Sequence, residues 1–184
     1  MDATKILKEE HGGVKIMLGI LGKVCDRLKA GASIPPADLD RILEFLRVFV
    51  DRCHHAKEED FLFPAMERAG VGREGGPIGE MLSEHERGRK HARGMAAAAD
   101  GCRRGDRDAG KRFVLEARGY IELLLEHIEK EDEIIYPMAD EMLGEDADRT
   151  LVQHFDRVEE ERVGHGRHEE FHRLMEELQK TYGD

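Results

Sequence analysis

The segment HHAKEEDFLFP, residues 54–64, recurs 73 residues later as HIEKEDEIIYP, residues 127–137. Both copies follow one pattern: a histidine, a Lys-Glu pair three residues on, two acidic residues, two apolar residues, an aromatic residue and a proline. Such a match, with histidine, lysine, glutamate and proline all in register, argues against chance. The sequence therefore predicts an internal duplication.

A second pair of residues follows nearly the same spacing. Glu10-His11 is followed 74 residues later by Glu84-His85. Each half of the chain thus contributes one lone histidine and one His-x-x-x-Glu motif. The proline that ends each motif lies inside a helical pattern, so we expect it to kink or end its helix.

Apolar residues recur at steps of three and four along almost the whole chain, as is typical of amphipathic helices. No stretch alternates for long enough to predict a strand. The fold class that this pattern predicts is all-α: an antiparallel up-down four-helix bundle with a C-terminal helical segment packed outside it. We expect residues 1–143 to form the bundle and residues 144–184 to be an extension of the same domain. The predicted helices span about 6–28, 38–68, 78–102, 108–143 and 147–182, the last interrupted at 164–166.

Composition excludes several classes of partner. The 184 residues include 29 Lys and Arg against 40 Asp and Glu, a formal net charge of −11. This charge argues against nucleic acid or an anionic membrane as a partner. No apolar run approaches the roughly 20 residues of a membrane span, and the first ten residues lack the apolar stretch of a signal peptide. Three dispersed cysteines do not indicate a disulfide framework. We therefore expect a cytoplasmic protein.

The repeated motifs favour a metal site. A histidine and a glutamate four residues apart lie on one face of a helix. A helix rise of about 1.5 Å per residue places all the repeated histidines about 24–30 Å from one end of the bundle, hence at one level. Burying imidazoles and carboxylates without partners would cost several kcal/mol. The alternative is that the histidines are satisfied core residues and the acids a solvated face. The predicted metal ligands are His11, His54, Glu58, His85, His127 and Glu131.

These motifs resemble the hemerythrin-like (HHE cation-binding) domain family, over about residues 1–143. The resemblance implies a non-haem centre of two iron ions in a four-helix bundle. The four histidines would be terminal ligands, and Glu58 and Glu131 would bridge the irons. An oxo or hydroxo group or water would complete the centre. Zinc or manganese are alternatives, because imidazole and carboxylate suit them as well.

One position departs from the oxygen-carrying members of that family. They have a further histidine one turn after the ligand that corresponds to His85, and here that position is Arg89. With one imidazole fewer, a metal position is either open to water or substrate or filled by a further carboxylate. This difference favours reaction with, or sensing of, oxygen, nitric oxide or peroxide over reversible oxygen carriage. The alternatives are a non-enzymatic module for iron storage, delivery or metal sensing, and a purely structural bundle. The sequence identifies no protein partner and does not decide whether there is turnover.

Residues near the motifs have weaker indications. His55 and Glu59 repeat the four-residue spacing but are turned by about 100°, so we expect them to support the ligands or face solvent. Tyr120 and Arg89 are candidates to hydrogen-bond a small molecule on the metals, although a core role suits Tyr120 better. A solvated face, rather than a surface metal site, is favoured for His165, His168 and His172.

Overall fold

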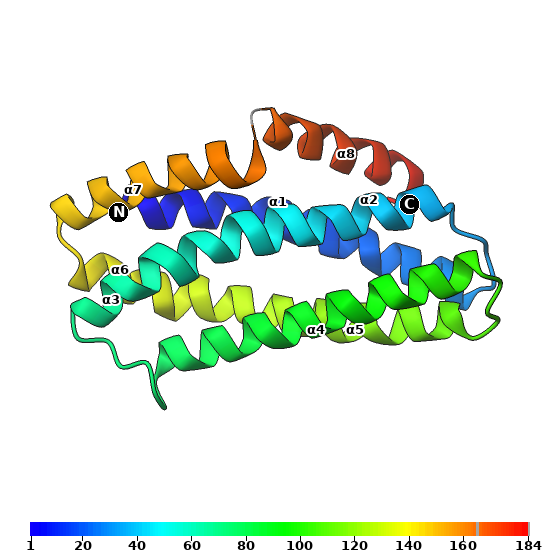
Figure 1. Ribbon diagram of the computed structural model, residues 1–184, viewed down its shortest axis with the longest axis horizontal. Helices are drawn as coiled ribbons and strands as arrows, with labels where there is room; N and C mark the ends of the chain where they lie inside the picture. The colour runs from blue at the N-terminus through cyan, green and yellow to red at the C-terminus, as the bar shows by residue number, and fades with distance from the viewer. Residues whose placement is uncertain (165, 184) are drawn as a thin grey trace.

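The computed structural model describes residues 1–164 and 166–183, and the secondary structure within them is helical, with no strand. The all-α expectation is confirmed. Four π-helical segments (η1 to η4) continue the α-helices. Figure 1 shows the course of the helices. The elements are α1 (Asp2–Lys29), α2 (Pro36–Phe45), η1 (Leu46–His55), η2 (Glu58–Leu62), α3 (Phe63–Arg68), α4 (Pro77–Arg103), α5 (Ala109–Lys130), η3 (Glu131–Ile135), α6 (Tyr136–Met142), α7 (Glu145–Val158), η4 (Glu159–Val163) and α8 (Arg167–Tyr182).

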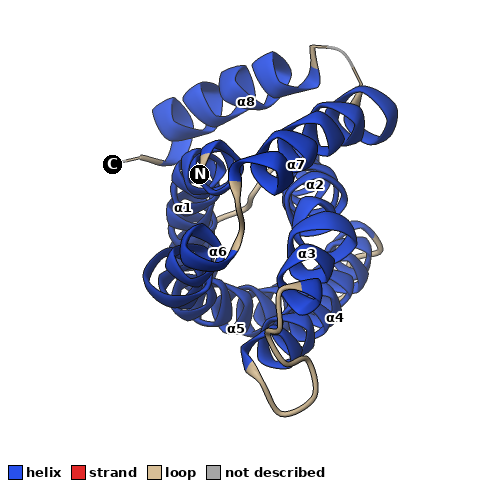
Figure 2. Cartoon of the chain, turned by 90° about the vertical axis from the view of Figure 1, so that its left-hand side faces the viewer, coloured by secondary structure: helices blue, strands red, loops and turns tan. Residues whose placement is uncertain are grey.

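The helices run along the long axis of the molecule and pack side by side (Figure 1). Helix α5 contacts both α1 and α4. The continuous helical segment formed by α2 and η1 also contacts α4 and α1. Seen from one end, these helices surround a common interior, and α7 and α8 lie outside it (Figure 2). The helix ends fall within a few residues of the predicted ones because glycine and proline mark them; Gly31, at φ +80°, follows α1, and Pro77 opens α4.

Of the two outcomes expected at the motif prolines, an end of the helix is not observed. Helix α3 continues past Pro64, and helix α6 continues past Pro137. Each proline is preceded by a π-helical segment, in which the carbonyl of Glu58 accepts from the N–H of Phe63 and that of Glu131 from Tyr136. An α-helical proline clashes with the carbonyl four residues before it. We attribute the wider turns to relief of this clash, and they coincide with the two motif glutamates.

The described core consists of two apolar clusters with a buried polar layer between them. On α1, Leu7 belongs to one cluster and Val14 to the other, with His11 in between. On α4, His85 likewise separates Met81 from Met95. The predicted common level of the motif residues is therefore present in the structure.

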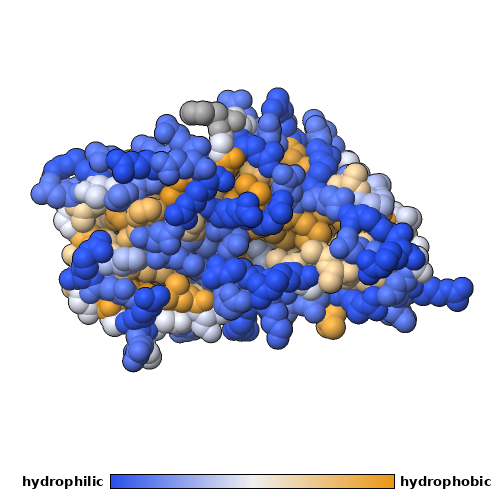
Figure 3. All heavy atoms as spheres, in the orientation of Figure 1, coloured by the Kyte–Doolittle hydropathy of each residue, from blue (hydrophilic) through white to orange (hydrophobic). Residues whose placement is uncertain are grey.

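The C-terminal helices complete both clusters. Helices α7 and α8 both contact α1. Phe155 of α7 is fully buried in one cluster, and Phe171 of α8 packs edge-to-face on Phe45 in the other. The face shown in Figure 3 is mostly hydrophilic, with apolar side chains visible between the helices. None of the described helices has the length and apolarity needed to cross a membrane.

Candidate metal centre

The structure brings all six predicted ligands together in the polar layer. Each is at most 2% exposed, which is unusual for ionisable groups. They come from four separate segments: α1 supplies His11, η1 and η2 supply His54 and Glu58, α4 supplies His85, and α5 and η3 supply His127 and Glu131.

The ligand atoms form two adjoining groups, each within 4.8 Å: His11, His54 and Glu131, and His85, His127, Glu58 and Glu131. In each group two histidines face each other through their Nε2 atoms. These atoms are 3.1 Å apart for His11 and His54 and 3.0 Å apart for His85 and His127. Glu131 reaches both groups, with Oε2 at 3.1 Å from His11 Nε2 and Oε1 at 3.0 Å from His127 Nε2.

Each of these histidines has a carboxylate on its other ring nitrogen. A carboxylate is an acceptor, so each Nδ1 donates, and in a neutral imidazole Nε2 then carries a lone pair. Basic side chains hold the carboxylates in turn. The Nδ1 distances are 2.8 Å for His11 to Asp132, 2.9 Å for His54 to Glu10, 2.6 Å for His85 to Glu59 and 3.0 Å for His127 to Glu84.

The Nε2 lone pairs of the four histidines therefore face one another in two pairs. Two facing lone pairs about 3 Å apart repel unless a metal or a proton lies between them. Within the described residues, Glu58 Oε2 and both carboxylate oxygens of Glu131 are buried and accept no hydrogen bond. Buried polar groups are nearly always partnered. The donor set thus fits a pair of bound cations.

The buried acids and imidazoles of the centre share protons. Burial and the negative charge of Glu131 raise the pKa of Glu58 well above its usual range. Burial would also raise the pKa of Glu131, but the charge of His127 holds the pKa of Glu131 well below its usual range. Burial would lower the pKa of His127, yet the charge of Glu131 and the hydrogen bond to Glu84 raise the pKa of His127 to about 9. Cations entering the centre would displace these protons.

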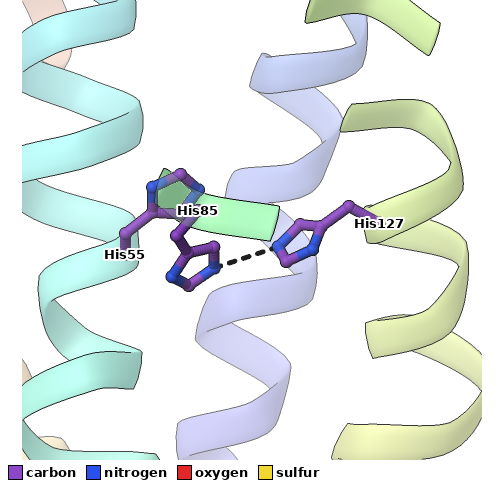
Figure 4. Close-up of side chains that lie close together, drawn as sticks. All are labelled: His55, His85 and His127. Carbon is purple, nitrogen blue, oxygen red and sulfur yellow. Dashed lines mark hydrogen bonds between the residues drawn. The ribbon is translucent and has the colours of Figure 1, made fainter. Parts of the chain in front are cut away.

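His55 and Glu59 both lie at the centre. Glu59 supports a ligand, as expected, by accepting from His85 and from Arg89. His55 does not face solvent: it is 3% exposed, and its ring stacks on that of His85 with centroids 3.8 Å apart (Figure 4). A π-helical turn holds more residues than an α-helical turn, so consecutive side chains diverge less than the sequence reasoning assumed.

Tyr136 is the aromatic residue of the second motif copy, and the sequence did not predict that it lies at the centre. Its hydroxyl donates to Glu58 Oε1 at 2.7 Å and lies 3.3 Å from His11 Nε2. The equivalent residue of the other motif copy is Phe63, which has no hydroxyl. The aromatic position of the repeat was therefore a signal for a residue at the centre.

Arg89 does not lie as expected, whereas Tyr120 does. Arg89 donates to Asp51, Glu59 and Glu86 rather than toward the facing Nε2 atoms. Tyr120 is 3% exposed and belongs to an apolar cluster, in line with its expected core role. Arg89, Tyr120 and His55 line a cavity of about 570 Å³ between the α2–η1 segment and α4.

A second buried group lies beside the centre. Lys57 is fully buried, and its ammonium donates to Glu10 and to Glu159 of η4. Glu10 and Glu159 also lie close to Cys53 and His168, and all four side chains are of types that can bind a metal. The lysine supplies the positive charge that Glu10 and Glu159 require.

The three C-terminal histidines differ. His168 is half-buried, with Nε2 3.8 Å from Cys53 Sγ and from a Glu159 oxygen, so it is not fully solvated. His172 is exposed, as expected. His165 lies outside the described residues.

Comparison with known proteins identifies the family. The model of the hemerythrin HHE cation-binding domain matches residues 2–139. The chain belongs to this family. The hemerythrin-like chain is also 24% identical, over 181 residues, to the proteins named Rv1995 in Mycobacterium tuberculosis and Mb2018 in Mycobacterium bovis, both called uncharacterized. The match covers 98% of this chain and 70% of each relative. No solved structure matches the chain significantly.

Proposed function

We propose that this hemerythrin-like protein binds two iron ions as a resident non-haem centre. His11 and His54 would hold one iron, His85 and His127 the other, with Glu58 and Glu131 as the carboxylate ligands. The observation that carries the proposal is the pair of facing Nε2 atoms in each group, each histidine being oriented by a carboxylate on Nδ1. The same donors suit zinc or manganese, so the metal identity must be measured.

We further propose that the loaded centre reacts with, or senses, a small oxidant: oxygen, nitric oxide or peroxide. Iron would supply the redox or ligand-binding chemistry. The surrounding chain would exclude bulk water, because the ligands are buried, and Tyr136 would place a hydroxyl beside Glu58 and His11. The cavity that His55 lines supports access by a small molecule.

The alternative is a non-enzymatic module for iron storage or metal sensing. The carboxylate on every ligand histidine favours a permanently held cofactor over metal that is stored and released, because such partners fix the rings and raise metal affinity. Reaction with an oxidant distinguishes the two functions.

For the architecture, we propose an antiparallel up-down four-helix bundle over residues 1–143, with residues 144–184 as part of the same domain. The shared apolar clusters support this assignment, because α7 and α8 bury Phe155 and Phe171 in them. We also propose a cytoplasmic location without a nucleic-acid or membrane partner. The net charge of −11 and three free cysteines support this proposal.

Metal analysis tests the main proposal. Metal-free protein is loaded with ferrous iron without air, desalted and analysed, and its optical spectrum is recorded before and after exposure to oxygen, nitric oxide or peroxide. We expect about two irons per chain and a change in near-ultraviolet charge-transfer absorption. Less than one equivalent of bound metal would defeat the di-iron proposal. Full loading without any spectral response would favour the storage or sensing module.

A further inference from the structure

The two halves of the centre share one plan, so their differences are informative. In the first pair of equivalent chains, a histidine bonds to a glutamate and the glutamate to a lysine. The residues are His54, Glu10 and Lys57 in one half and His127, Glu84 and Lys130 in the other. In the second pair, a histidine bonds to a carboxylate and the carboxylate to a basic side chain. The residues are His11, Asp132 and Lys15 in one half and His85, Glu59 and Arg89 in the other. The supporting hydrogen bonds thus follow the sequence repeat, and they do not distinguish one metal position from the other.

His55 breaks this symmetry. Its equivalent in the second motif copy is Ile128, which is 1% exposed and belongs to an apolar cluster. An isoleucine suffices to fill such a position. An imidazole at the same depth requires partners, since burying polar groups without hydrogen bonds is costly.

Among residues 1–164 and 166–183, His55 has no partner within 3.5 Å of a ring nitrogen. Neither of its ring nitrogens makes a hydrogen bond, and the nearest carboxylate oxygen, of Asp51, is 3.6 Å from Nδ1. A buried, unsatisfied imidazole is a rare feature in a protein interior.

The ring of His55 lies against the His85–His127 pair. It stacks on His85 at an interplanar angle of 15° and lies edge-on to His127, with centroids 6.0 Å apart. Figure 4 shows the three rings converging from η1, α4 and α5. One nitrogen from each of His55, His85 and His127 lies within 4.8 Å of the others, close enough to hold a common cation after small side-chain adjustments.

We propose that His55 is a third histidine ligand of the metal held by His85 and His127, an inference that rests on the proposed metal-binding function. This metal would have one more imidazole than its neighbour, so the two positions would be chemically inequivalent. The additional imidazole comes from η1, the segment that already supplies His54, and not from α4, where Arg89 occupies the position of the missing histidine.

The test uses cobalt(II), whose visible absorption reports coordination number and donor type. Metal-free wild type, His55→Phe and His55→Ala are titrated without air, and metal per chain, binding curves and spectra are compared. The Phe variant keeps a ring against His85 but has no nitrogen. His91→Ala is the matched control, because His91 is half-exposed on the same helix as His85 and bonds to Glu116. Melting of the metal-free variants checks that they fold.

We expect wild type and His91→Ala to bind two cobalt ions with the same spectrum. In both His55 variants one of the two binding steps should weaken at least about tenfold, and the visible absorption of that step should change. Added imidazole should restore the absorption of His55→Ala. In cobalt-loaded wild type, His55 should also give a hyperfine-shifted N–H resonance in addition to those of the four paired histidines.

Two results would overturn the inference and are distinguishable. If wild type binds two ions and both His55 variants match it in affinity and spectrum, the inference alone fails. If wild type binds less than one ion of cobalt or iron, the proposed function fails and the inference falls with it.

Discussion

The ammonium of Lys57 lies 2.6 Å from a carboxylate oxygen of Glu159 and also donates to Glu10, so one buried cation joins the C-terminal segment to the buried polar layer. Burial would lower the pKa of Lys57, but the charge of Glu10 outweighs it and raises the pKa, so the side chain stays charged. Glu10 is the carboxylate that orients His54. The segment after residue 144 is thereby connected to a proposed ligand.

Replacing this lysine should destabilise the protein strongly. Lys57→Met leaves Glu10 buried without its cation, and removing one partner of a buried ion pair costs about 3–5 kcal/mol. The matched control is Lys130→Met in the other half. Lys130 is one-third exposed, so we expect Lys130→Met to lower the free energy of unfolding by about 1 kcal/mol or less. Denaturant unfolding of the metal-free proteins measures both, and equal losses would contradict the difference in burial.

Removing a proposed ligand should lower both metal content and thermal stability. In His54→Ala and His127→Ala one imidazole of a facing pair is lost, so less metal should bind per chain and the melting temperature of the loaded protein should fall. Metal analysis and calorimetry check this. His172→Ala, on the exposed face of α8, should change neither quantity.

Much of this centre could be predicted from the sequence because a repeated motif reports positions that act together. The duplicated His-x-x-x-Glu motifs and the lone histidines led to six side chains that the structure brings together. The helices followed from apolar spacing, and their ends from glycine and proline, because these effects are local.

The supporting partners could not be predicted in this way because they act across helices. Glu10 precedes His11 in the chain, yet it bonds to His54, and Glu84 likewise bonds to His127 rather than to its neighbour. Lys57 reads as part of a solvated Glu-Lys face until its burial is known. The stacking of His55 on His85 joins η1 to α4, and the spacing of residues along one helix does not report such a contact.

Bound metal should stabilise the fold. The centre buries Glu58 and Glu131 at 0% exposure, and metal would compensate carboxylate oxygens that have no hydrogen-bond partner in the described chain. A ligand at 100 times its dissociation constant stabilises by about 2.7 kcal/mol. Stripping the protein with a chelator should therefore lower its melting temperature, and returning ferrous iron should restore it. Identical melting with and without metal would favour a purely structural bundle.

The orienting carboxylates should affect metal affinity without being ligands. Glu84→Gln weakens the acceptor for His127 Nδ1, and loss of such a partner typically lowers metal affinity about 10–100-fold. Glu80→Gln is the control, because Glu80 shares the same Lys130 but is not hydrogen-bonded to His127. Competition titrations with a chromophoric chelator compare the two variants, and equal affinities would show that the carboxylate does not tune the centre.

Tyr136→Phe should make the two halves of the centre more alike, since Phe63 is the equivalent residue. The substitution removes the hydroxyl that donates to Glu58 Oε1. In the metal-free protein a buried carboxyl oxygen then loses its partner, at a cost of about 1–3 kcal/mol. In the loaded protein the loss should be smaller, because metal partly replaces the hydroxyl. Tyr120→Phe, in the apolar cluster, should cost little in either state. Unfolding both variants with and without metal measures the difference, and a Tyr136→Phe cost that is the same in both states would mean that the hydroxyl and the metal do not act on the same carboxylate.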